Sequence, residues 1–487
     1  MNQRYEDDAF AREARKLLGA RGFTTDAVTM APWLTDWRGR YSGKARALAS
    51  PASTREVSDL VALCARHGVP IVAQGGNSGM SGGATPDASG VALLLSLRRM
   101  TAIRRLDAAA GQAVCEAGVI LETLHQAAAE VGLRFPLTLG GKGSATIGGL
   151  VATNAGGTQV LRHGTMRAQV LGLEAVLADG SVLDLLAPLK KDNRGFDLQQ
   201  LFIGSEGTLG IVCAATLRLL PAIAARCTAW VGLKGLEEAE RLLHAFECAA
   251  PDLLEGFEVL PDQALAAVLS HDRGTRAPLA GPHAWHALVE LASPDGEQAL
   301  DRIVEEVLAE AIERGWAADA AVAANERQAQ AFWRLRDGIS AAQRALGPAM
   351  QHDIAVPAGR MAAFVAAAVP EIERRFPGTR AIAFGHLGDG NVHFHVLAPP
   401  GGQRGAWEVG EGATISTYVH DLVTAWQGTI SAEHGVGQMK RDELVRTADP
   451  VRLAVLASVK QALDPRGLLN PGKLIDPAAL APPPGSP

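Results

Sequence analysis

The sequence has 487 residues, of which 47% are hydrophobic, and its formal net charge at neutral pH is −6. This length exceeds what one hydrophobic core usually supports, so it predicts a globular chain of two or three domains. Basic residues are spread along the chain rather than gathered in one run, which argues against a nucleic-acid partner.

The first 220 residues are expected to form a mixed unit of helices and strands. The N-terminal run is charged and helix-like. Ser53 and Glu56 have the spacing of a capping box before a helix over Val57–Arg66, which Gly68 ends. A strand over Pro70–Ala73 leads from there into a glycine-rich loop. The further expected elements are strands at Val91–Leu97, Gln112–Glu116 and Leu171–Leu177 and a helix over Val119–Val131.

Beyond Pro221 the pattern changes to longer helical segments, which predicts a second domain. Helices are expected over Leu236–Ala249 and Glu297–Arg314, with a strand over Trp285–Leu291 between them. The end of the chain, Asp476–Pro487, is rich in Pro and Ala and is expected to be disordered.

Glycine is over-represented, with 53 residues that cluster at 75–83, 140–157 and 204–210. The first cluster directly follows an expected strand, so its amides can converge on an anion such as a diphosphate. A glycine-rich surface loop is the alternative explanation for each segment alone. No GxGxxG or GxxxxGK[ST] motif occurs, which argues against a Rossmann site or a P-loop. Three close backbone approaches indicate a long, flat ligand.

In this order and spacing, the three glycine segments resemble the FAD-binding domain of the vanillyl-alcohol oxidase and p-cresol methylhydroxylase superfamily. The resemblance implies an α+β fold with a two-subdomain FAD-binding domain, an α+β substrate (cap) domain and a C-terminal helical segment. The implied boundaries are 1–222 for the FAD-binding domain, 223–425 for the substrate domain with a metal motif, 426–475 for a segment returning to the FAD domain and 476–487 for the tail.

The resemblance also implies which residues contact the cofactor. Neither His nor Cys occurs between Gln74 and Gly83, where some members attach FAD, so we expect non-covalent FAD. The implied FAD contacts are Gln74, Gly75, Gly76, Asn77, Ser78, Gly79, Met80, Pro136, Leu137, Gly140, Gly143, Ser144, Ile147, Gly148, Thr153, Asn154, Gly156, Glu206, Gly210, Ile211 and Asn470.

Four of the 13 histidines lie in two short glycine-flanked motifs. His386 and His393 lie on either side of a Gly-Asp-Gly turn, and His393 and His395 share a strand face by period two. Farther on, Glu433 and His434 are adjacent. For any single histidine, a satisfied polar group in a turn is the alternative. Two histidines and one carboxylate make an open-sided site for a divalent ion.

The pattern GHLGDGN-x-H followed by AEHG resembles the D-lactate, glycolate and D-2-hydroxyglutarate dehydrogenase branch of the superfamily. It implies that His386, His393 and Glu433 bind zinc, or Mn or Co, and that His434 lies beside the substrate as a base. A metal ion would lower the pKa of the substrate hydroxyl, and imidazole could take its proton. Hydride would then pass to flavin N5, which turns a D-2-hydroxy acid such as D-lactate or D-2-hydroxyglutarate into the 2-oxo acid.

Further residues are substrate candidates. Arg336 matches an arginine that the branch carries near the start of a helix, where it would clamp a carboxylate, although a solvated or paired surface arginine is the alternative. Ser340, one turn on, and Asn391 are additional candidates. Gln351 stands where D-2-hydroxyglutarate dehydrogenases place a lysine, so lactate-like acids compete with 2-hydroxyglutarate. His395 replaces an asparagine of some relatives and could be a fourth ligand or support the others.

Other functions stay open at this point. They are a non-redox flavin transferase of the alkyl-dihydroxyacetonephosphate synthase type, a subunit of a glycolate oxidase and a metallohydrolase. The expected electron acceptor is an electron-transfer flavoprotein, a quinone or a cytochrome, and a homodimer is possible.

The five cysteines form no CxxC pair, no signal peptide is apparent and no window reaches about 18 apolar residues. We therefore expect a soluble, cytoplasmic protein with reduced thiols.

Overall fold

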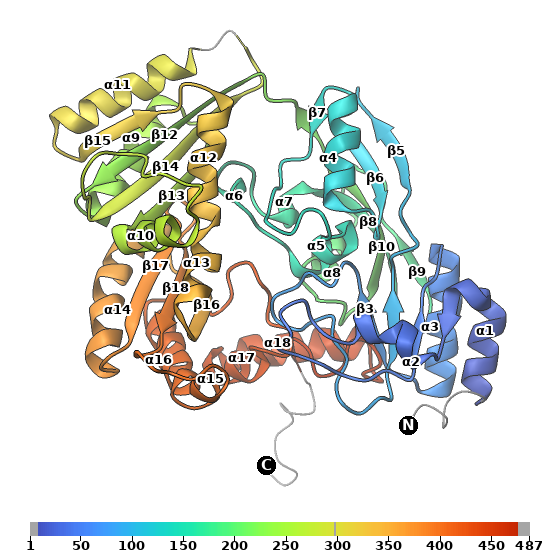
Figure 1. The fold of residues 1–487 in the computed structure, drawn as a ribbon. Helices are drawn as coiled ribbons and strands as arrows, with labels where there is room; N and C mark the ends of the chain where they lie inside the picture. Colours follow the sequence, from blue (N-terminus) through green and yellow to red (C-terminus); the bar gives the residue numbers. More distant parts are fainter. Residues whose placement is uncertain (1–7, 297–298, 476–487) are drawn as a thin grey trace. The chain divides into compact units, whose positions relative to one another are not determined.

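The computed structural model describes residues 8–296 and 299–475. It forms two compact units (Figure 1). The described residues of Met1–Gly157, Gly164–Pro221 and Glu433–Pro487 form the first unit, and those of Thr158–His163 and Ala222–Ala432 form the second. The expected disordered tail, Asp476–Pro487, lies outside the described residues. No helix in the described ranges combines the length and the apolar character that crossing a membrane requires.

Two larger sheets and one short strand pair form the framework of the first unit. The strands are β1 (Phe23–Thr24), β2 (Ala47–Ala49), β3 (Ile71–Gln74), β4 (Leu93–Ser96), β5 (Ile103–Asp107), β6 (Gln112–Glu116), β7 (Leu133–Arg134), β8 (Val170–Val176), β9 (Val182–Asp184), β10 (Ile211–Arg218) and β11 (Leu220–Pro221). The first sheet has the order β1-β2-β4-β3, with parallel pairs except at β1. The second, β5-β6-β10-β8-β9, is antiparallel. Strand β4 is buried along its whole length, as expected for an inner parallel strand.

The helices of the first unit follow local sequence signals. They are α1 (Ala9–Gly22), α2 (Ala27–Met30), the 3-10 turn η2 (Ala31–Trp33), α3 (Thr54–His67), α4 (Leu121–Glu130), α5 (Ile147–Thr153), α7 (Met166–Gln169), α8 (Gln199–Phe202), α17 (Arg441–Thr447) and α18 (Pro450–Leu463). Ser53 caps α3 by accepting the N–H of Glu56 at 3.2 Å. The Glu56 carboxylate accepts the N–H of Ala52, one residue before the cap, so the reciprocal bond of a capping box is shifted by one position. Gly68 ends the helix at φ 64°, a conformation that glycine adopts without strain.

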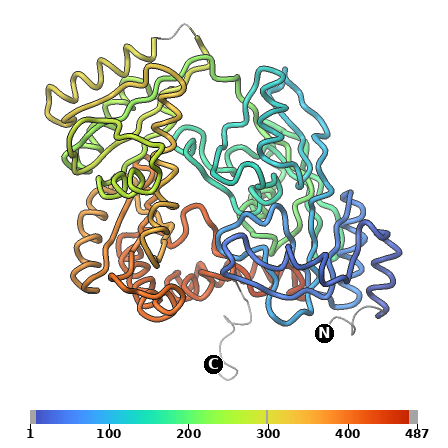
Figure 2. The backbone as a smooth tube through the Cα atoms, in the orientation of Figure 1, coloured from blue at the N-terminus to red at the C-terminus, as the bar shows by residue number. Residues whose placement is uncertain are grey.

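The C-terminal segment is part of the first unit. Leu469 forms a parallel bridge with Ile71, and its side chain belongs to the same apolar core as α1 and α3. Figure 2 shows this late part of the chain beside the early strands. Lys460 of α18 donates to the carbonyl of Leu469 at 2.9 Å and to the Asp464 carboxylate at 2.5 Å. These contacts hold the turn that carries Asn470.

One seven-stranded antiparallel sheet is the framework of the second unit. Its strands are β12 (Ala225–Leu233), β13 (Leu254–Pro261), β14 (Trp285–Ser293), β15 (Ala317–Val322), β16 (Ala349–Ala355), β17 (Arg380–His386) and β18 (Asn391–Leu397). The spatial order is β15-β12-β14-β13-β17-β18-β16. The surrounding helices are α6 (Val160–His163), α9 (Leu236–Ala249), α10 (Asp262–His271), α11 (Leu300–Glu313), α12 (Glu326–Asp337), α13 (Ile339–Leu346), η3 (Ala358–Arg360), α14 (Met361–Arg375), α15 (Ala406–Val409) and α16 (Glu411–Ala425).

One face of this sheet, here called the α12 face, is covered by α10, α12 and α13. Phe332, Leu335 and Ile339 from these helices share a buried cluster with Trp230 and Phe384 of the sheet. Register places further residues on the same face, because directly opposed residues point the same way. The rows are Trp230, Leu288, Glu258 and His386; Phe384, His393 and Asp353; and Ile382, His395 and Gln351.

The elements expected from the sequence are found with shifted ends. The helix Leu236–Ala249 is α9 without change, and Trp285–Leu291 lies within β14. The expected helix Glu297–Arg314 is observed as Leu300–Glu313, while positions 297–298 lie outside the described residues. Helix α5, inside the second glycine segment, was not expected from the sequence. Its glycines are poor helix formers, but Ile147 and Leu150 are buried against the core, and this packing outweighs the propensity.

Candidate flavin and metal sites

The three glycine segments come together in the first unit. A Cβ atom on Gly75 would lie 2.3 Å from Thr146 Oγ1, and one on Gly76 would lie 1.8 Å from the carbonyl oxygen of Ser144. The first and second segments therefore pack so closely that only glycine fits at these positions. The third segment joins them because Glu206 donates its N–H to the carbonyl of Ala152 at 2.7 Å.

These segments, together with the turn at Asn470, hold most of the left-handed backbone found outside glycine in the described residues. Six described residues other than glycine have a positive φ, and four of them are Asn77, Asn154, Glu206 and Asn470. Asn470 ties the segments together by donating its amide to the carbonyls of Gly83 and Glu206 at 2.9 and 2.7 Å. Left-handed backbone at residues other than glycine costs free energy and concentrates at ligand sites.

Buried polar atoms at the same place are suited to a polar ligand. Gln74 Oε1, Thr146 Oγ1 and Asn470 Oδ1 are buried and lack a hydrogen-bond partner within the described ranges. Buried polar groups normally find partners, and unpaired ones indicate a ligand or ordered solvent. The close-packed glycines and strained backbone fit a ligand that approaches the main chain, and the two unpaired amide oxygens fit a ligand with hydrogen-bond donors, such as the hydroxyl, imide and amino groups of FAD.

The remaining residues implied as FAD contacts divide by exposure. Gly79, Gly140, Gly143 and Ser144 are exposed, and Asn77, Ser78, Met80 and Thr153 are partly exposed. The buried ones are Pro136, Leu137, Ile147, Gly148, Gly156, Gly210 and Ile211. Ile147 and Ile211 are core side chains, and Gly148 allows close packing on Ala117, whose Cβ would be 2.6 Å from an added Cβ. Residues whose side chains are buried in the core in this way can contact a ligand only through their backbone atoms.

The AEHG motif is attached to the glycine segments through its backbone. Ser81 Oγ donates to the carbonyls of His434 and Gly435 at 3.1 and 3.0 Å. The N–H groups of Val436 and Gly437 donate to the two carboxylate oxygens of Glu206 at 2.7 Å each. Burial raises the pKa of Glu206, and these two hydrogen bonds act in the opposite direction. Glu206 therefore serves the motif that carries His434, a role that sequence reasoning missed, as it missed Ser81.

The candidate metal ligands lie at the hairpin of β17 and β18. The rings of His386 and His393 have centroids 5.5 Å apart. One ligand atom each from His386, His393 and Glu433 lie within 4.8 Å of one another. Glu433 directly follows Ala432, whose N–H donates to the carbonyl of Asp353 at 3.3 Å, beside His393 in the ladder. This donor set of two imidazoles and one carboxylate fits a divalent ion with open coordination positions.

A second possible ligand group overlaps the first. Ligand atoms of Asp353, Glu433 and His434 also lie within 4.8 Å of one another. Asp353 is 3% exposed and accepts a hydrogen bond from Asn391 Nδ2 at 3.0 Å. The same amide donates to the carbonyl of Ile354 at 2.9 Å, so Asn391 orients the Asp353 carboxylate. Asp353 was not among the residues singled out in the sequence.

Glu258 supports both His386 and Arg336. Its Oε1 lies 2.5 Å from His386 Nδ1, and its Oε2 accepts from Arg336 Nε at 2.9 Å. Burial raises the pKa of Glu258, but the charges of Arg336 and His386 and their hydrogen bonds lower it by more, so the net pKa lies below the usual value. When a carboxylate accepts the Nδ1–H of a histidine, Nε2 is the ring atom that can bind a metal ion. This is the usual arrangement around a metal-binding histidine.

The position of Arg336 differs from the expectation. It lies in the last turn of α12, not near the start of a helix, because α12 begins at the Asn325 cap eleven positions earlier in the chain and ends at Gly338. Its Nη2 atom is 3.4 Å from His386 Nε2. Ser340, expected one turn farther on, lies in the first turn of the next helix, α13.

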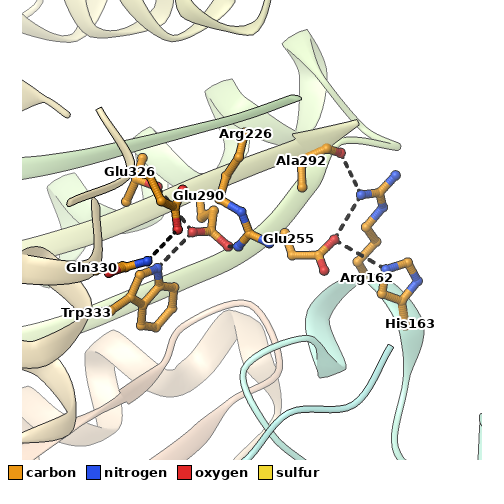
Figure 3. Close-up of polar contacts among 10 residues, drawn as sticks. Arg162, His163, Arg226, Glu255, Glu290, Ala292, Glu326, Gln330 and Trp333 are labelled. Carbon is orange, nitrogen blue, oxygen red and sulfur yellow. Dashed lines mark hydrogen bonds and ion pairs between the residues drawn. The ribbon is translucent and has the colours of Figure 1, made fainter. Parts of the chain in front are cut away.

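A second group of buried charges lies in the same unit and does not include the candidate metal ligands (Figure 3). Glu255 accepts from Arg162 at 2.9 Å and lies 3.3 Å from His163 Nε2. Glu290 forms an ion pair with Arg226 and accepts the indole N–H of Trp333 at 2.8 Å. Burial raises the pKa of Glu290, and the Arg226 charge partly offsets this. The Glu255 contacts anchor α6, the short segment that the second unit takes from the middle of the first unit's sequence.

Comparison with known families identifies both units. A model described as "FAD binding domain" matches residues 45–186, and one described as "FAD linked oxidases, C-terminal domain" matches 224–474. D-2-hydroxyglutarate dehydrogenase of Xanthomonas citri is 35% identical over 452 residues, covering 93% of this chain and 94% of that protein. The mitochondrial enzyme of Arabidopsis thaliana is 35% identical over 462 residues, covering 95% of this chain and 80% of that protein.

Solved structures share the fold. A p-cresol methylhydroxylase with bound substrate matches with a TM-score of 0.73 at 16% identity, covering 96% of both chains. An alkyldihydroxyacetonephosphate synthase matches with a TM-score of 0.71 at 16% identity, covering 95% of this chain and 84% of that one. The chain shares its fold with p-cresol methylhydroxylase, belongs to the family of FAD-linked oxidases together with the D-2-hydroxyglutarate dehydrogenases, and is an FAD-dependent oxidoreductase.

Proposed function

We propose that the protein oxidises a D-2-hydroxy acid to the 2-oxo acid with FAD and a divalent metal ion. The observation that carries the proposal is the meeting of His386, His393 and Glu433 in a chain whose relatives are D-2-hydroxyglutarate dehydrogenases. The reaction removes the proton of the hydroxyl group and a hydride from C2 of the substrate. FAD, when bound, supplies the hydride acceptor.

The side chains have separate roles in this proposal. His386, His393 and Glu433 would hold zinc, manganese or cobalt, which would make the substrate hydroxyl more acidic. His434 is the proposed base, because imidazole titrates near neutral pH and its backbone is held by Ser81. Arg336 is the proposed clamp for the C1 carboxylate, oriented by its ion pair with Glu258.

Ser340, Gln351 and Asn391 complete the proposed substrate residues. Gln351 and Asn391 lie on strands β16 and β18 and Ser340 on α13. The proposal also includes an electron acceptor other than oxygen, which is an electron-transfer flavoprotein, a quinone or a cytochrome. In the assay a dye replaces this acceptor.

The substrate class is tested by anaerobic mixing of the purified, FAD-loaded protein with single 2-hydroxy acids. D-Lactate, D-2-hydroxyglutarate and their L enantiomers are compared, and the flavin absorbance near roughly 450 nm is followed. We expect bleaching by at least one D acid and appearance of the 2-oxo acid after addition of the dye. No bleaching by any acid would contradict the proposal and favour a non-redox transferase.

The metal is tested by chelation and by His393→Ala. Both are expected to lower turnover by at least ~100-fold, because the open site loses the ion that polarises the hydroxyl. FAD should stay bound, since the glycine segments belong to the first unit. Metal content is measured by mass spectrometry and FAD content by absorbance, with His244→Ala at an exposed histidine as the control. Full turnover in verified metal-free protein would refute the metal role.

A further inference from the structure

Gln351 and His395 lie on the α12 face next to the candidate metal ligands, and Gln343 of helix α13 contacts His395. Gln351 of β16 stands directly opposite His395 of β18, so their side chains are neighbours on one face. His395 lies two residues after His393 on the same strand and therefore points the same way. Gln343 of α13 reaches His395 from above the sheet, with its Oε1 hydrogen-bonded to Nδ1 of the imidazole.

Two amide nitrogens of this trio are buried and unpaired. Gln343 Nε2 and Gln351 Nε2 have no hydrogen-bond partner among the residues that the structure describes. Gln343 is fully buried, and its neighbours Ile339 and Ala342 belong to the apolar core, which fixes the part of α13 that carries it. Because buried N–H groups are nearly always paired, two of them beside one histidine point to a hydrogen-bond acceptor that enters from outside the chain.

The trio offers donors without a permanent positive charge. Both glutamines are neutral at every pH, and Arg336, which contacts His386 and Glu258, is assigned above to the C1 carboxylate. A carboxylate moved from water to this place would lose its hydration without gaining a counter-charge from the trio itself. A hydroxyl or carboxamide oxygen can satisfy the two N–H groups without that penalty.

We infer that Gln343, Gln351 and His395 form the subsite for the substrate's end distal to C2, and that it selects an uncharged hydrogen-bond acceptor over a second carboxylate. The inference rests on the proposed function and names the substrate class of that site. The preferred substrate is thus a 2-hydroxy acid whose chain ends in a hydroxyl or a carboxamide.

The test uses the full-length, FAD-loaded protein and four acids of equal chain length. They are 2-hydroxyglutarate, its 5-carboxamide, 2,5-dihydroxypentanoate and 2-hydroxypentanoate, which differ only at the distal end. We expect kcat/KM for the carboxamide and dihydroxy acids to exceed that for the other two by about tenfold or more, the effect of one well-placed hydrogen bond or of one buried charge. Dissociation constants of the matching 2-oxo acids, measured by calorimetry, should follow the same order.

Variants separate the residues. Gln351→Lys should move the preference toward 2-hydroxyglutarate by at least tenfold, because it adds a cation. Gln343→Leu should lower kcat/KM for the two polar-ended acids more than for 2-hydroxypentanoate. Gln351→Met, at a half-buried position, gives the same readout if the Gln343 variant does not fold. Gln330→Leu, on the exposed side of α12, is the matched control and should change nothing.

The outcomes distinguish this inference from the proposed function. If all four acids bleach the flavin with equal efficiency, or if 2-hydroxyglutarate is preferred by the wild type, the subsite is refuted while the dehydrogenase function stands. If Gln351→Lys leaves the order unchanged, the position does not contact the distal end and the inference is refuted. If neither lactate nor any of these four acids bleaches the flavin, both the inference and the proposed function are refuted.

Discussion

At the scale of single residues, the site depends on side chains that hold other side chains. Glu258 is only 1% exposed, yet it contacts both His386 and Arg336. Ser81 and Glu206 similarly hold the backbone on which His434 is presented. The geometry of the reacting groups is therefore set by residues one contact away from them.

Replacing Glu258 by Gln should weaken the metal site without removing a ligand. The amide keeps the shape but loses the charge that makes the His386 imidazole a better donor, so metal affinity should fall about 10- to 100-fold. Competition with a chromophoric chelator measures the affinity. Glu290→Gln is the matched control, because Glu290 is equally buried on the same sheet but is bonded to Arg226 and Trp333. Equal affinities for wild type and Glu258→Gln would show that His386 does not bind the ion.

At the scale of elements, the antiparallel sheet of the second unit does most of the positioning. Its register brings β16, β17 and β18 together so that Gln351, Asp353, His393, His395 and His386 share the α12 face. A shift by one residue would turn all of these side chains to the opposite face. Helices α12 and α13 then cover this face and contribute Arg336 and Gln343.

A buried ion pair contributes to the attachment of short helix α6 to β13. Arg162 donates to Glu255 at 2.9 Å and to the carbonyl of Ala292 at 2.7 Å, and Glu255 is 2% exposed (Figure 3). Arg162→Met should therefore lower the free energy of unfolding by about 3–5 kcal/mol, because it leaves a buried carboxylate with one fewer counter-charge. Urea denaturation followed by tryptophan fluorescence measures the change.

The double variant Arg162→Met with Glu255→Gln checks the cause of this loss. It should recover part of the stability, since removing both charges avoids leaving the buried Glu255 carboxylate with one fewer counter-charge. Arg194→Ala breaks the exposed ion pair with Asp192 and should leave the free energy of unfolding nearly unchanged. Equal effects of the Arg162 and Arg194 substitutions would mean that the Glu255 pair does not anchor α6.

At the scale of the whole molecule, burial separates the five cysteines into four inert thiols and one reactive thiol. Cys64, Cys115, Cys213 and Cys227 are buried, and Cys248 on α9 is exposed. Burial raises the pKa of Cys64 and of Cys115 to about 12, and it raises the pKa of Cys213 and Cys227 as well. Thiolates are the reactive form, so the buried thiols should not react near pH 8.

Ellman's reagent at pH 8 should therefore label one thiol per native chain and five in guanidinium chloride. Cys248→Ser should abolish the native reaction. Because the folded pKa of the buried thiols is raised, their contribution to stability is complete below about pH 8.5 and is lost as the pH rises toward 12. Alkaline titration should thus expose more thiols above about pH 9, and rapid labelling of several thiols at pH 8 would contradict this assignment.

The sequence by itself determined the cofactor class and the candidate metal ligands. The glycine segments at 75–83, 140–157 and 204–210 can be recognised from the local sequence, since only glycine tolerates such close backbone approach. His386 and His393 are held together by one tight turn, so their proximity follows from seven positions of sequence. Elements with strong periodicity, such as α9 and β14, were predictable for the same local reason.

Only the tertiary structure decided which distant residues support these motifs. Glu258 is 128 positions from His386, Gln343 is 52 from His395 and Ser81 is 353 from His434. Local sequence reports propensity and periodicity, whereas strand order and register decide which side chains meet across a sheet. A carboxylate within an apolar strand, such as Glu258, signals a buried partner but does not name it, because the partner is chosen by the fold of the chain.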